Sequence, residues 1–421
     1  MNRRTMSILG AGAVLDFDYG SQQKPTTKYI TEKVVEEKIQ GYDGIDSELI
    51  KHIYDIVVKA SKDEYLRLHP AVKRYEQTIT FEDLFEVIET LYSYSSTWKH
   101  EHYPFSLISA LVKSDLDNYS VDYERAMQAI IKKIVEIVNE YNELFKKDGR
   151  EQWYKDFWKG FAGNVDVFNF NYDTTVEQSL GDYADGYVPF TQDYERFEPE
   201  VLWNASEDRA TVNHLHGCIL YGDPNPKPTE FHYSHRDLYK FYPDALKDAF
   251  ISGQWMPRNQ AGDAIFYSPI ITGLKKTDKL CFMPHNFYHA NLAKKIIENA
   301  SLLICGYSFG DLYVNQLLQR HKLIHDKNER VVLVDKWTDV HDTDSLFKHI
   351  KDNPRLFEYV LRIIECSFEA MLETFRQFKQ VADGCWESPN GTLRIYTKGF
   401  KPAVVEHGSE LLGYLKSSLP K

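Results

Sequence analysis

Short runs of consecutive apolar residues alternate along the chain with longer segments in which apolar residues recur every three or four positions. The runs are typical of strands buried on both faces of a parallel sheet, and the longer spacing is typical of helices that bury one face. A first strand that breaks into a glycine-rich turn is expected within residues 7–14, and further strands are expected at 165–173, 212–220, 300–305 and 330–335. Helices separate several of these strands, as crossover connections do between parallel strands. The pattern therefore predicts an α/β fold with a Rossmann-like, doubly wound parallel sheet.

Between residues 45 and 147 the helical spacing is present throughout. Helices are expected at 47–60, 81–92, 106–113 and 123–145. The last of them has the clearest apolar stripe, which runs from Ala126 to Tyr141. Such a stripe ordinarily packs into a core, so we interpret this region as a large helical insertion, suited to form a lid or to make contacts in an assembly.

The remaining expected elements lie before and after the helical insertion, and the chain is expected to have three parts. Thr31 is expected to cap a charged helix that runs to Ile39. Further helices are expected at 287–299, 315–321 and 356–381, and strand-like pieces at 392–397 and 403–406. The expected parts are an α/β domain over 1–44 and 151–345, the helical insertion over 45–150, and a small C-terminal region over 346–421 that serves assembly.

The composition is that of a globular protein with an acidic balance. The 421 residues carry a formal net charge of -12, which disfavours general binding to nucleic acid or to an anionic membrane surface. No apolar run approaches the length of a transmembrane helix. Five scattered cysteines, none of them in a C-x-x-C pair, indicate reduced thiols and a cytoplasmic protein. Aromatic residues make up 14% of the chain, which favours aromatic-rich packing or large interfaces, and the second would suit a homo-oligomer.

The first expected strand ends in the glycine-rich turn Gly10-Ala11-Gly12. Glycine at 10 allows a sharp turn, and glycine at 12 removes the Cβ that would keep a pyrophosphate away. A helix after the turn would direct its free N–H groups and the positive end of its dipole at that phosphate. The dinucleotide fingerprint has a third Gly or Ala at the position where this chain has Leu15. Two interpretations are open from the turn alone, a nucleotide site and a tight turn without a ligand.

Polar side chains follow three other expected strands, in the segments Asn169–Asp173, His214–Gly217 and Gly306–Asp311. Because ligands of open α/β sheets bind beyond the carboxyl ends of the strands, these groups are expected to converge beside the Gly turn. Each also has a structural interpretation, since Asn and Asp cap helices at strand exits and a lone His is often a buried structural residue. His214 and His216 would share one face of a strand, but no carboxylate motif beside them completes a metal site. We therefore expect no metal ligands.

Together the four motifs resemble those of the SIR2-like family, which has the sirtuin-type NAD-binding fold, in the divergent form found in bacterial anti-phage defence. Gly10–Ala13 is similar to the sirtuin Gly-Ala-Gly opening, and Asn169–Asp173 to the strand that ends Thr-Gln-Asn-Ile-Asp. His216–Gly217 is similar to the catalytic His-Gly. Gly306–Ser308 is similar to the Gly-Thr-Ser strand end, and its extension to Gly-Tyr-Ser-Phe-Gly-Asp is typical of the defence branch.

The resemblance implies NAD as the substrate and assigns roles to the matching residues. Asn171 would hold a water molecule or the ribose hydroxyls, and His216 would accept a proton from one of them, so these two are the expected catalytic residues. Asp173 would orient the ribose or the Asn171 amide. The residues expected to bind NAD are Gly10, Ala11, Gly12, Asp173, Gly306, Ser308 and Asp335.

Two departures from sirtuins narrow the expected activity. The two C-x-x-C pairs that hold a structural zinc in deacylating sirtuins are absent, so no zinc is expected, and no Pro-Asp-Phe-Arg segment follows the Gly turn. Both departures favour an NAD+ glycohydrolase that releases nicotinamide and ADP-ribose. The resemblance implies an effector of anti-phage abortive infection that depletes NAD, with a HerA-type hexameric ATPase as partner. The alternatives are a non-catalytic module that senses NAD or ADP-ribose, an NAD-dependent deacylase and an ADP-ribosyltransferase.

Overall fold

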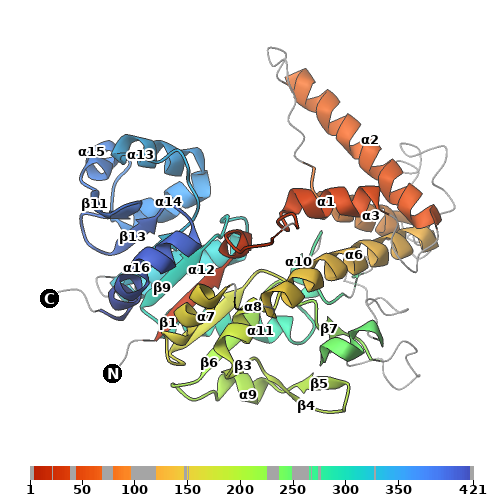
Figure 1. Cartoon of the computed structure of the whole chain (residues 1–421). Helices are drawn as coiled ribbons and strands as arrows, with labels where there is room; N and C mark the ends of the chain where they lie inside the picture. Colours follow the sequence, from red (N-terminus) through yellow and green to blue (C-terminus); the bar gives the residue numbers. More distant parts are fainter. Residues whose placement is uncertain are drawn as a thin grey trace.

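The computed structural model describes residues 4–20, 22–37, 44–68, 79–95, 120–146, 149, 151–224, 237–248, 265–266, 268–273, 276–326 and 329–417. It has one large sheet, helices on both faces of that sheet and a helical layer at one end (Figure 1). The predicted α/β fold class is confirmed. The helix expected at 106–113 lies outside the described residues.

The large sheet has nine strands in the order β11-β12-β13-β10-β9-β1-β2-β6-β3. Their bounds are β1 Thr5–Leu9, β2 Val165–Asn169, β3 Tyr183–Ala184, β6 Ala210–His214, β9 Ser301–Cys305, β10 Arg330–Val334, β11 Lys379–Ala382, β12 Cys385–Glu387 and β13 Leu393–Tyr396. Neighbouring strands from β13 to β3 are parallel, whereas the β11–β12 and β12–β13 pairs are antiparallel. From β1 the chain adds β2 and β6 on one side and later β9 and β10 on the other. The strand order therefore reverses beside β1, where open α/β sheets bind their ligands.

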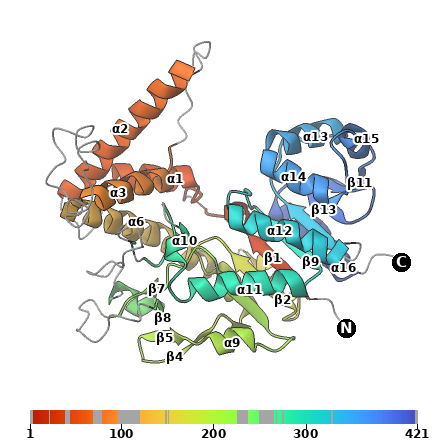
Figure 2. The same cartoon turned by 180° about the vertical axis from the view of Figure 1, so that it is seen from behind.

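Alternate side chains of each strand fill two cores, one on either face of the sheet. Met6 and Ile8 of β1 belong to one core, whereas Leu303 and Cys305 of β9 belong to the other. The covering helices are α7 (Gln152–Lys159), α8 (Thr175–Leu180) and α16 (Phe400–Lys416) on the face seen in Figure 1, and α11 (His285–Glu298) and α12 (Leu312–His325) on the face seen in Figure 2. Because both faces are covered, the strands are continuous apolar runs in the sequence, which is why they could be predicted.

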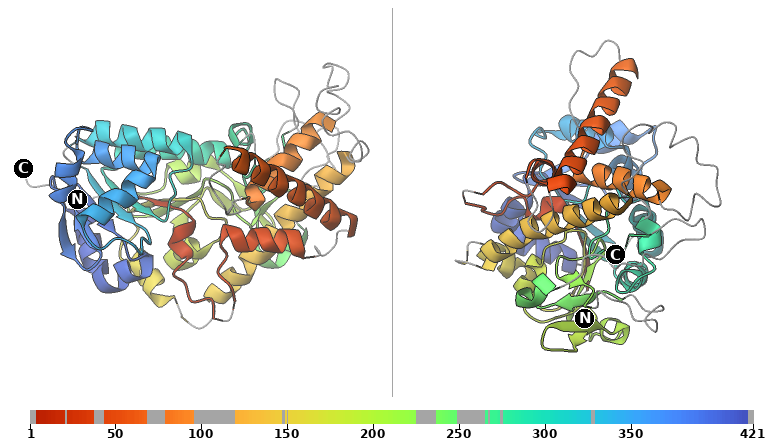
Figure 3. Two further views of the ribbon diagram at one scale, coloured as in Figure 1. Left: turned by 90° about the horizontal axis from the view of Figure 1, so that it is seen from above. Right: turned by 90° about the vertical axis from the view of Figure 1, so that its right-hand side faces the viewer.

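The connection from β1 to β2 contains a layer of helices that pack against one another. They are α1 (Thr27–Glu36), α2 (Gly44–Leu68), α3 (Phe81–Ser95) and α6 (Ser120–Lys146). Figure 3 shows this layer at the end of the molecule opposite the C-terminal strands. The cap predicted at Thr31 is wrong: Thr26 accepts a bond from the Tyr29 N–H at 3.1 Å, and the Thr31 hydroxyl donates back to the Thr27 carbonyl at 2.7 Å within α1.

The residues after 345 are built into the same sheet through β11 to β13. Three helices precede these strands: α13 (Thr343–Asp352), α14 (Pro354–Ile363) and α15 (Met371–Arg376). The single helix expected at 356–381 is wrong, because α14 stops at Ile363 and Glu365 has a left-handed φ of 55°. The strand piece expected at 403–406 is also wrong, since it lies in α16. The assembly role of this part of the chain remains a prediction.

A smaller antiparallel sheet, in the order β4-β5-β8-β7, lies beside the parallel one. Its strands are β4 Tyr187–Pro189, β5 Tyr194–Phe197, β7 Tyr221–Gly222 and β8 Tyr239–Phe241, and the short helices are η1 Ala11–Val14, α9 Pro199–Trp203, η2 Pro243–Asp248 and α10 Lys276–Lys279. The strand expected at 212–220 ends at His214, because the chain turns at Gly217, where φ is 87°. Of the helices in the described ranges, none has both the length and the apolar character needed to cross a bilayer.

Candidate active site

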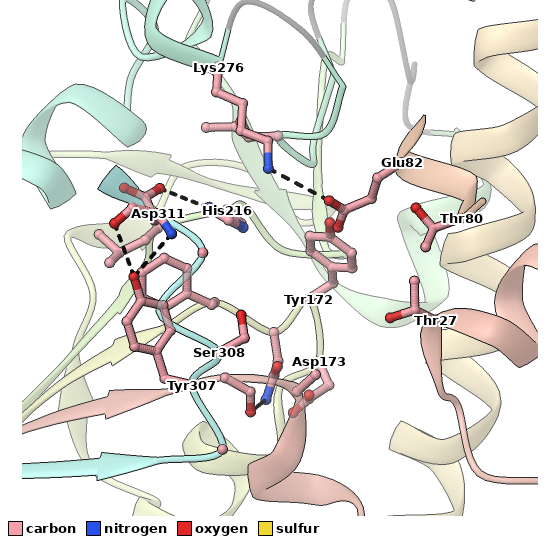
Figure 4. Close-up of a pocket in the computed structure, with 18 of the residues that line it drawn as sticks. Thr27, Thr80, Glu82, Tyr172, Asp173, His216, Lys276, Tyr307, Ser308 and Asp311 are labelled. Atoms are coloured by element: carbon pink, nitrogen blue, oxygen red, sulfur yellow. Dashed lines mark hydrogen bonds and ion pairs between the residues drawn. The ribbon is translucent and has the colours of Figure 1, made fainter. Parts of the chain in front are cut away.

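A cavity of about 720 Å³ lies at the carboxyl ends of β1, β2, β6 and β9. The expected site residues on its wall are Gly10, Ala11, Asn171, Asp173, His216, Gly306 and Ser308. Figure 4 labels Asp173, His216 and Ser308 among them. Strand register explains this convergence, because Leu9 pairs with Asn169 on one side and with Cys305 on the other. The residues that follow these strands therefore emerge at the same level of the sheet.

Gly10, Gly12 and Gly306 allow two backbone loops to pack in direct contact. A Cβ at Gly10 would lie 2.3 Å from the Gly306 carbonyl oxygen, and a Cβ at Gly12 would lie 2.6 Å from the Gly306 Cα. Gly306 also has a φ of 60°, which residues with a Cβ rarely adopt. The missing Cβ of Gly12 therefore has a structural reason, because it admits the Gly306 backbone, and the approach of a pyrophosphate to Gly12 remains a prediction.

The N–H groups of the Gly turn form bonds within the protein. The Gly10 N–H donates to the Cys305 carbonyl at 2.9 Å. The Gly12 N–H donates to the Gly306 carbonyl at 3.1 Å, and the Ala13 N–H donates to the Gly10 carbonyl at 3.0 Å. The four-residue helix η1 follows directly, in place of the predicted α-helix. The prediction of a helix directed at a phosphate is wrong, and these three amides are already engaged.

Asn171 is held through both its backbone and its side chain. Its N–H donates to the Asn169 Oδ1 at 3.0 Å, and its Nδ2 donates to the Gly10 carbonyl at 3.0 Å. The His214 Nδ1 donates to the Asn171 carbonyl at 3.3 Å. With Nδ2 engaged by the Gly turn, the Oδ1 atom is the end of this side chain that can accept a bond from a ligand or a water molecule.

Asp173 lies on the cavity wall and also binds the start of α8. Its Oδ1 accepts bonds from the Thr175 N–H at 3.0 Å and from the Thr175 hydroxyl at 2.6 Å. Burial raises the pKa of the Asp173 carboxyl, and the two bonds from Thr175 oppose that rise only in part. The structural interpretation of a strand-exit Asp therefore holds here. Contact of Asp173 with a ribose remains a prediction.

His216 follows β6 and pairs with Asp311, for which the sequence predicted a helix cap but no catalytic or binding role. The His216 Nε2 lies 3.6 Å from the Asp311 Oδ2, and the imidazole meets the Phe170 ring edge-on at 4.7 Å between centroids. Asp311 also caps α12, since its Oδ1 accepts from the Val314 N–H at 3.0 Å. Burial disfavours the charged carboxylate, but the bonds from His216 and Val314 outweigh it and lower the pKa of Asp311 to about 2. A negative charge therefore stands beside His216.

His214 is a buried structural residue. Its Nε2 bonds Glu177 and its Nδ1 donates to the Asn171 carbonyl; both partners can accept a bond, which favours the charged imidazolium form of the ring. Burial opposes that charge, but Glu177 raises the pKa of His214. His214 thus positions the Asn171 backbone. In the part of the chain that the structure describes, no group of His, Cys, Asp and Glu side chains is arranged to hold a metal ion.

His289 of α11 lies on the cavity wall and holds the backbone that carries His216. Its Nε2 donates to the Leu215 carbonyl at 3.2 Å, and the Ile271 N–H donates to the His216 carbonyl at 2.7 Å. Burial lowers the pKa of His289 to about 4, so its ring is neutral at pH 7. The peptide units on both sides of the His216 Cα are therefore fixed by neighbouring elements.

Asp335 lines a second cavity of about 200 Å³ instead of the first. Trp337 and His349 line the same cavity, with their rings stacked at 4.6 Å. The two cavities share the loop 306–308, so a ligand that occupied both would pass over that loop. Asp335 can therefore contact only the part of such a ligand that lies beyond Ser308.

The helical layer forms the cavity wall opposite the sheet. Thr27 of α1, Glu82 of α3 and Tyr141 of α6 line it. Lys276 of α10 lies on the same wall, and its Nζ is 3.7 Å from the Glu82 Oε2 (Figure 4). The sequence predicted no site residue in these helices, because their periodic stripes indicate only that one face is buried.

Fold and cavity define an α/β protein with a cavity at the carboxyl edge of a doubly wound parallel sheet. Residues 165–352 match the family model of the SIR2-like domain. The match begins at the first residue of β2 and includes Asn171, His216 and Asp311, but not the Gly turn. No curated protein matches the chain. The family match supports the relationship to the SIR2-like family that the motifs predicted, and it indicates an NAD-related activity.

Proposed function

We propose that this chain is an NAD+ glycohydrolase that releases nicotinamide and ADP-ribose. The observation that carries the proposal is the placement of Asn171 and the His216–Asp311 pair on one cavity at the edge of the sheet. The SIR2-like match over residues 165–352 supports NAD as the substrate. The expected NAD contacts at Gly10, Ala11, Asp173, Gly306 and Ser308 line the same cavity.

The chemistry needs little more than these groups. When the bond between the ribose C1′ and the pyridinium nitrogen breaks, the electron pair passes to the ring, so nicotinamide leaves neutral without a general acid. The Asp311 carboxylate favours the positive charge that develops on the ribose. A water molecule held by the Asn171 Oδ1 forms the new C1′–O bond, and His216 accepts its proton.

Two other classes of function use part of this arrangement. A module that senses NAD or ADP-ribose needs the cavity but has no use for a proton acceptor with a paired carboxylate, so we place it second. A deacylase or an ADP-ribosyltransferase breaks the same bond and differs in the group that attacks C1′. Water is the attacking group in our proposal because the absence of C-x-x-C pairs disfavours deacylation.

We further propose that the protein is a cytoplasmic, homo-oligomeric effector of anti-phage abortive infection that depletes NAD, with a HerA-type hexameric ATPase as partner. The support for this role is the resemblance of the Gly306–Asp311 motif to the defence branch, together with the aromatic richness of the chain. An enzyme that consumes NAD must be inactive in unchallenged cells, so control by assembly is expected.

The test is incubation of the purified protein with NAD+, alone and with the ATPase, while nicotinamide and ADP-ribose are measured. We expect release that falls by about 100-fold or more in Asn171→Ala and in His216→Ala. His52→Ala is the matched control, since His52 is exposed on α2. Release at the wild-type rate in both site variants would refute the site, and binding without release would favour the sensor.

A further inference from the structure

Lys276 is the lone lysine or arginine among the described residues that line the large cavity. Three carboxyl groups line the same cavity, those of Glu82, Asp173 and Asp311. The carboxyl groups disfavour an anionic ligand, and Lys276 is the side chain of this cavity that favours one through a permanent positive charge. A dinucleotide carries two negative charges on its pyrophosphate, so the location of a compensating cation decides how it binds.

The Gly turn offers few free N–H groups to compensate the negative charge of a phosphate. The Gly10, Gly12 and Ala13 N–H groups all donate to carbonyl groups of the protein, and the helix that follows has only four residues. The usual phosphate cradle of amides and helix dipole is thus largely engaged in internal bonds. A charged side chain can supply the compensation that these three amides do not give.

Two ion pairs join α10 to α3, and they differ in burial. Lys279 pairs with Glu89 at 3.0 Å, with side chains only 4% and 1% exposed, and also donates to the Thr272 carbonyl at 2.6 Å. Lys276 pairs with Glu82 at 3.7 Å, with side chains 40% and 42% exposed. A half-exposed pair of this kind contributes little to stability, so Lys276 can change its partner at small cost. The buried Lys279–Glu89 pair keeps α10 in place while Lys276 changes its partner.

We propose that Lys276 is the residue of this site that binds the phosphate groups of the ligand, and that Glu82 holds its ammonium group until the ligand replaces it. The proposal rests on the proposed function in that the phosphates are those of NAD+ and ADP-ribose. Binding then separates Lys276 from the carboxylate on α3, so the helical layer registers whether the cavity is filled.

The test compares Lys276→Gln with Lys294→Gln, whose side chain is 42% exposed and pairs with Glu298 at 3.8 Å on α11, away from the cavity. Binding of ADP-ribose is measured by calorimetry, and turnover is measured with NAD+ and with nicotinamide riboside, which lacks phosphate. We expect Lys276→Gln to weaken ADP-ribose binding and to raise the KM for NAD+ by about tenfold each, with a smaller salt dependence. The KM for nicotinamide riboside should stay unchanged, as should all values in Lys294→Gln.

Glu82→Gln should have the opposite effect on ADP-ribose binding, because it removes the carboxylate that pairs with Lys276. We expect about threefold tighter ADP-ribose binding in this variant. Equal losses for NAD+ and nicotinamide riboside in Lys276→Gln, or no loss for either, would overturn the proposal. If NAD+ is not hydrolysed but Lys276→Gln still weakens ADP-ribose binding, the proposed function fails and the phosphate site stands. If the wild-type protein does not bind ADP-ribose, both fail.

Discussion

The Nε2 of His216 lies 3.6 Å from the Oδ2 of Asp311, although the two residues follow different strands, β6 and β9. The other oxygen of the same carboxylate caps α12. One side chain thus orients an imidazole on the cavity wall and begins the helix beside it. The position of α12 and the orientation of His216 are coupled through this carboxylate.

Asp311→Asn separates the two tasks. Asn is as good a helix cap as Asp, so α12 should remain, whereas the negative charge beside His216 is lost. We expect kcat for NAD+ cleavage to fall by about 10- to 100-fold with little change in KM, because the charge acts on the developing cation and on the protonated imidazole. Steady-state kinetics and the thermal midpoint are measured together.

Asp342→Asn is the control for the charge change, since Asp342 also caps a helix by accepting a bond from the N–H three residues on, and it lies outside the cavity. Its kcat should equal that of the wild-type protein. A fall in kcat for Asp311→Asn that is matched by an equal fall in Asp342→Asn would show that the effect is general and not local to His216.

Two glycines of the packed loops, together with Gly181 at the end of α8, allow a graded test of stability. Gly12→Ala adds only a close contact, and Gly181→Ala adds only a left-handed strain, since φ is 76° with nothing within 4 Å of the new Cβ. Gly306→Ala adds both. We expect a loss of about 1 kcal/mol for Gly181→Ala and about 3 kcal/mol or more for Gly306→Ala, measured by urea unfolding.

Gly310→Ala on the same loop is the control, because its new Cβ would meet only the mobile Ser308 hydroxyl, at 3.3 Å. It should change the free energy of unfolding little. If Gly306→Ala were as stable as Gly310→Ala, the contact between the two loops would not be the reason for glycine at 306.

Much of the fold and the convergence of the motifs could be predicted, because both follow from local rules. Continuous apolar runs identify buried parallel strands, and the carboxyl ends of such strands meet at one edge. Asn171, His216 and Ser308 therefore lie on one cavity as expected. The strand at 392–397 was also predicted, although its place in the main sheet depends on pairing with β10, which no local pattern specifies.

What could not be predicted depends on contacts between distant segments. Asp311 reads as a helix cap in the sequence, and only the tertiary fold brings it to His216. Lys276 and Glu82 are charged residues on a short helix and a long one, with no pattern that links them across the cavity. Gly12 fits a phosphate turn in the sequence, whereas the structure shows a backbone contact with Gly306.

A last prediction concerns acid stability and His285, which is 1% exposed on α11. Burial, aided by the neighbouring histidines His289, His216 and His214, lowers the pKa of His285 to about 3. The folded protein thus binds fewer protons than the unfolded chain, in which a histidine titrates near about 6.5. Stability should therefore fall as the pH drops below that value, by about 2 kcal/mol between pH 7 and pH 5 for this residue.

His285→Leu removes this contribution of His285 to the pH dependence of stability and places an apolar side chain at the same buried position. Urea unfolding at pH 7 and pH 5 should show a smaller loss of stability in the variant than in the wild-type protein, with the difference close to about 2 kcal/mol. His214 acts with the opposite sign, since Glu177 raises its pKa, but it is present in both proteins and cancels in the comparison. His52→Leu, at an exposed position on α2, should retain the full wild-type loss. The same loss in His285→Leu as in the wild-type protein would mean that His285 takes up its proton equally in the folded and the unfolded protein, so that burial does not lower its pKa.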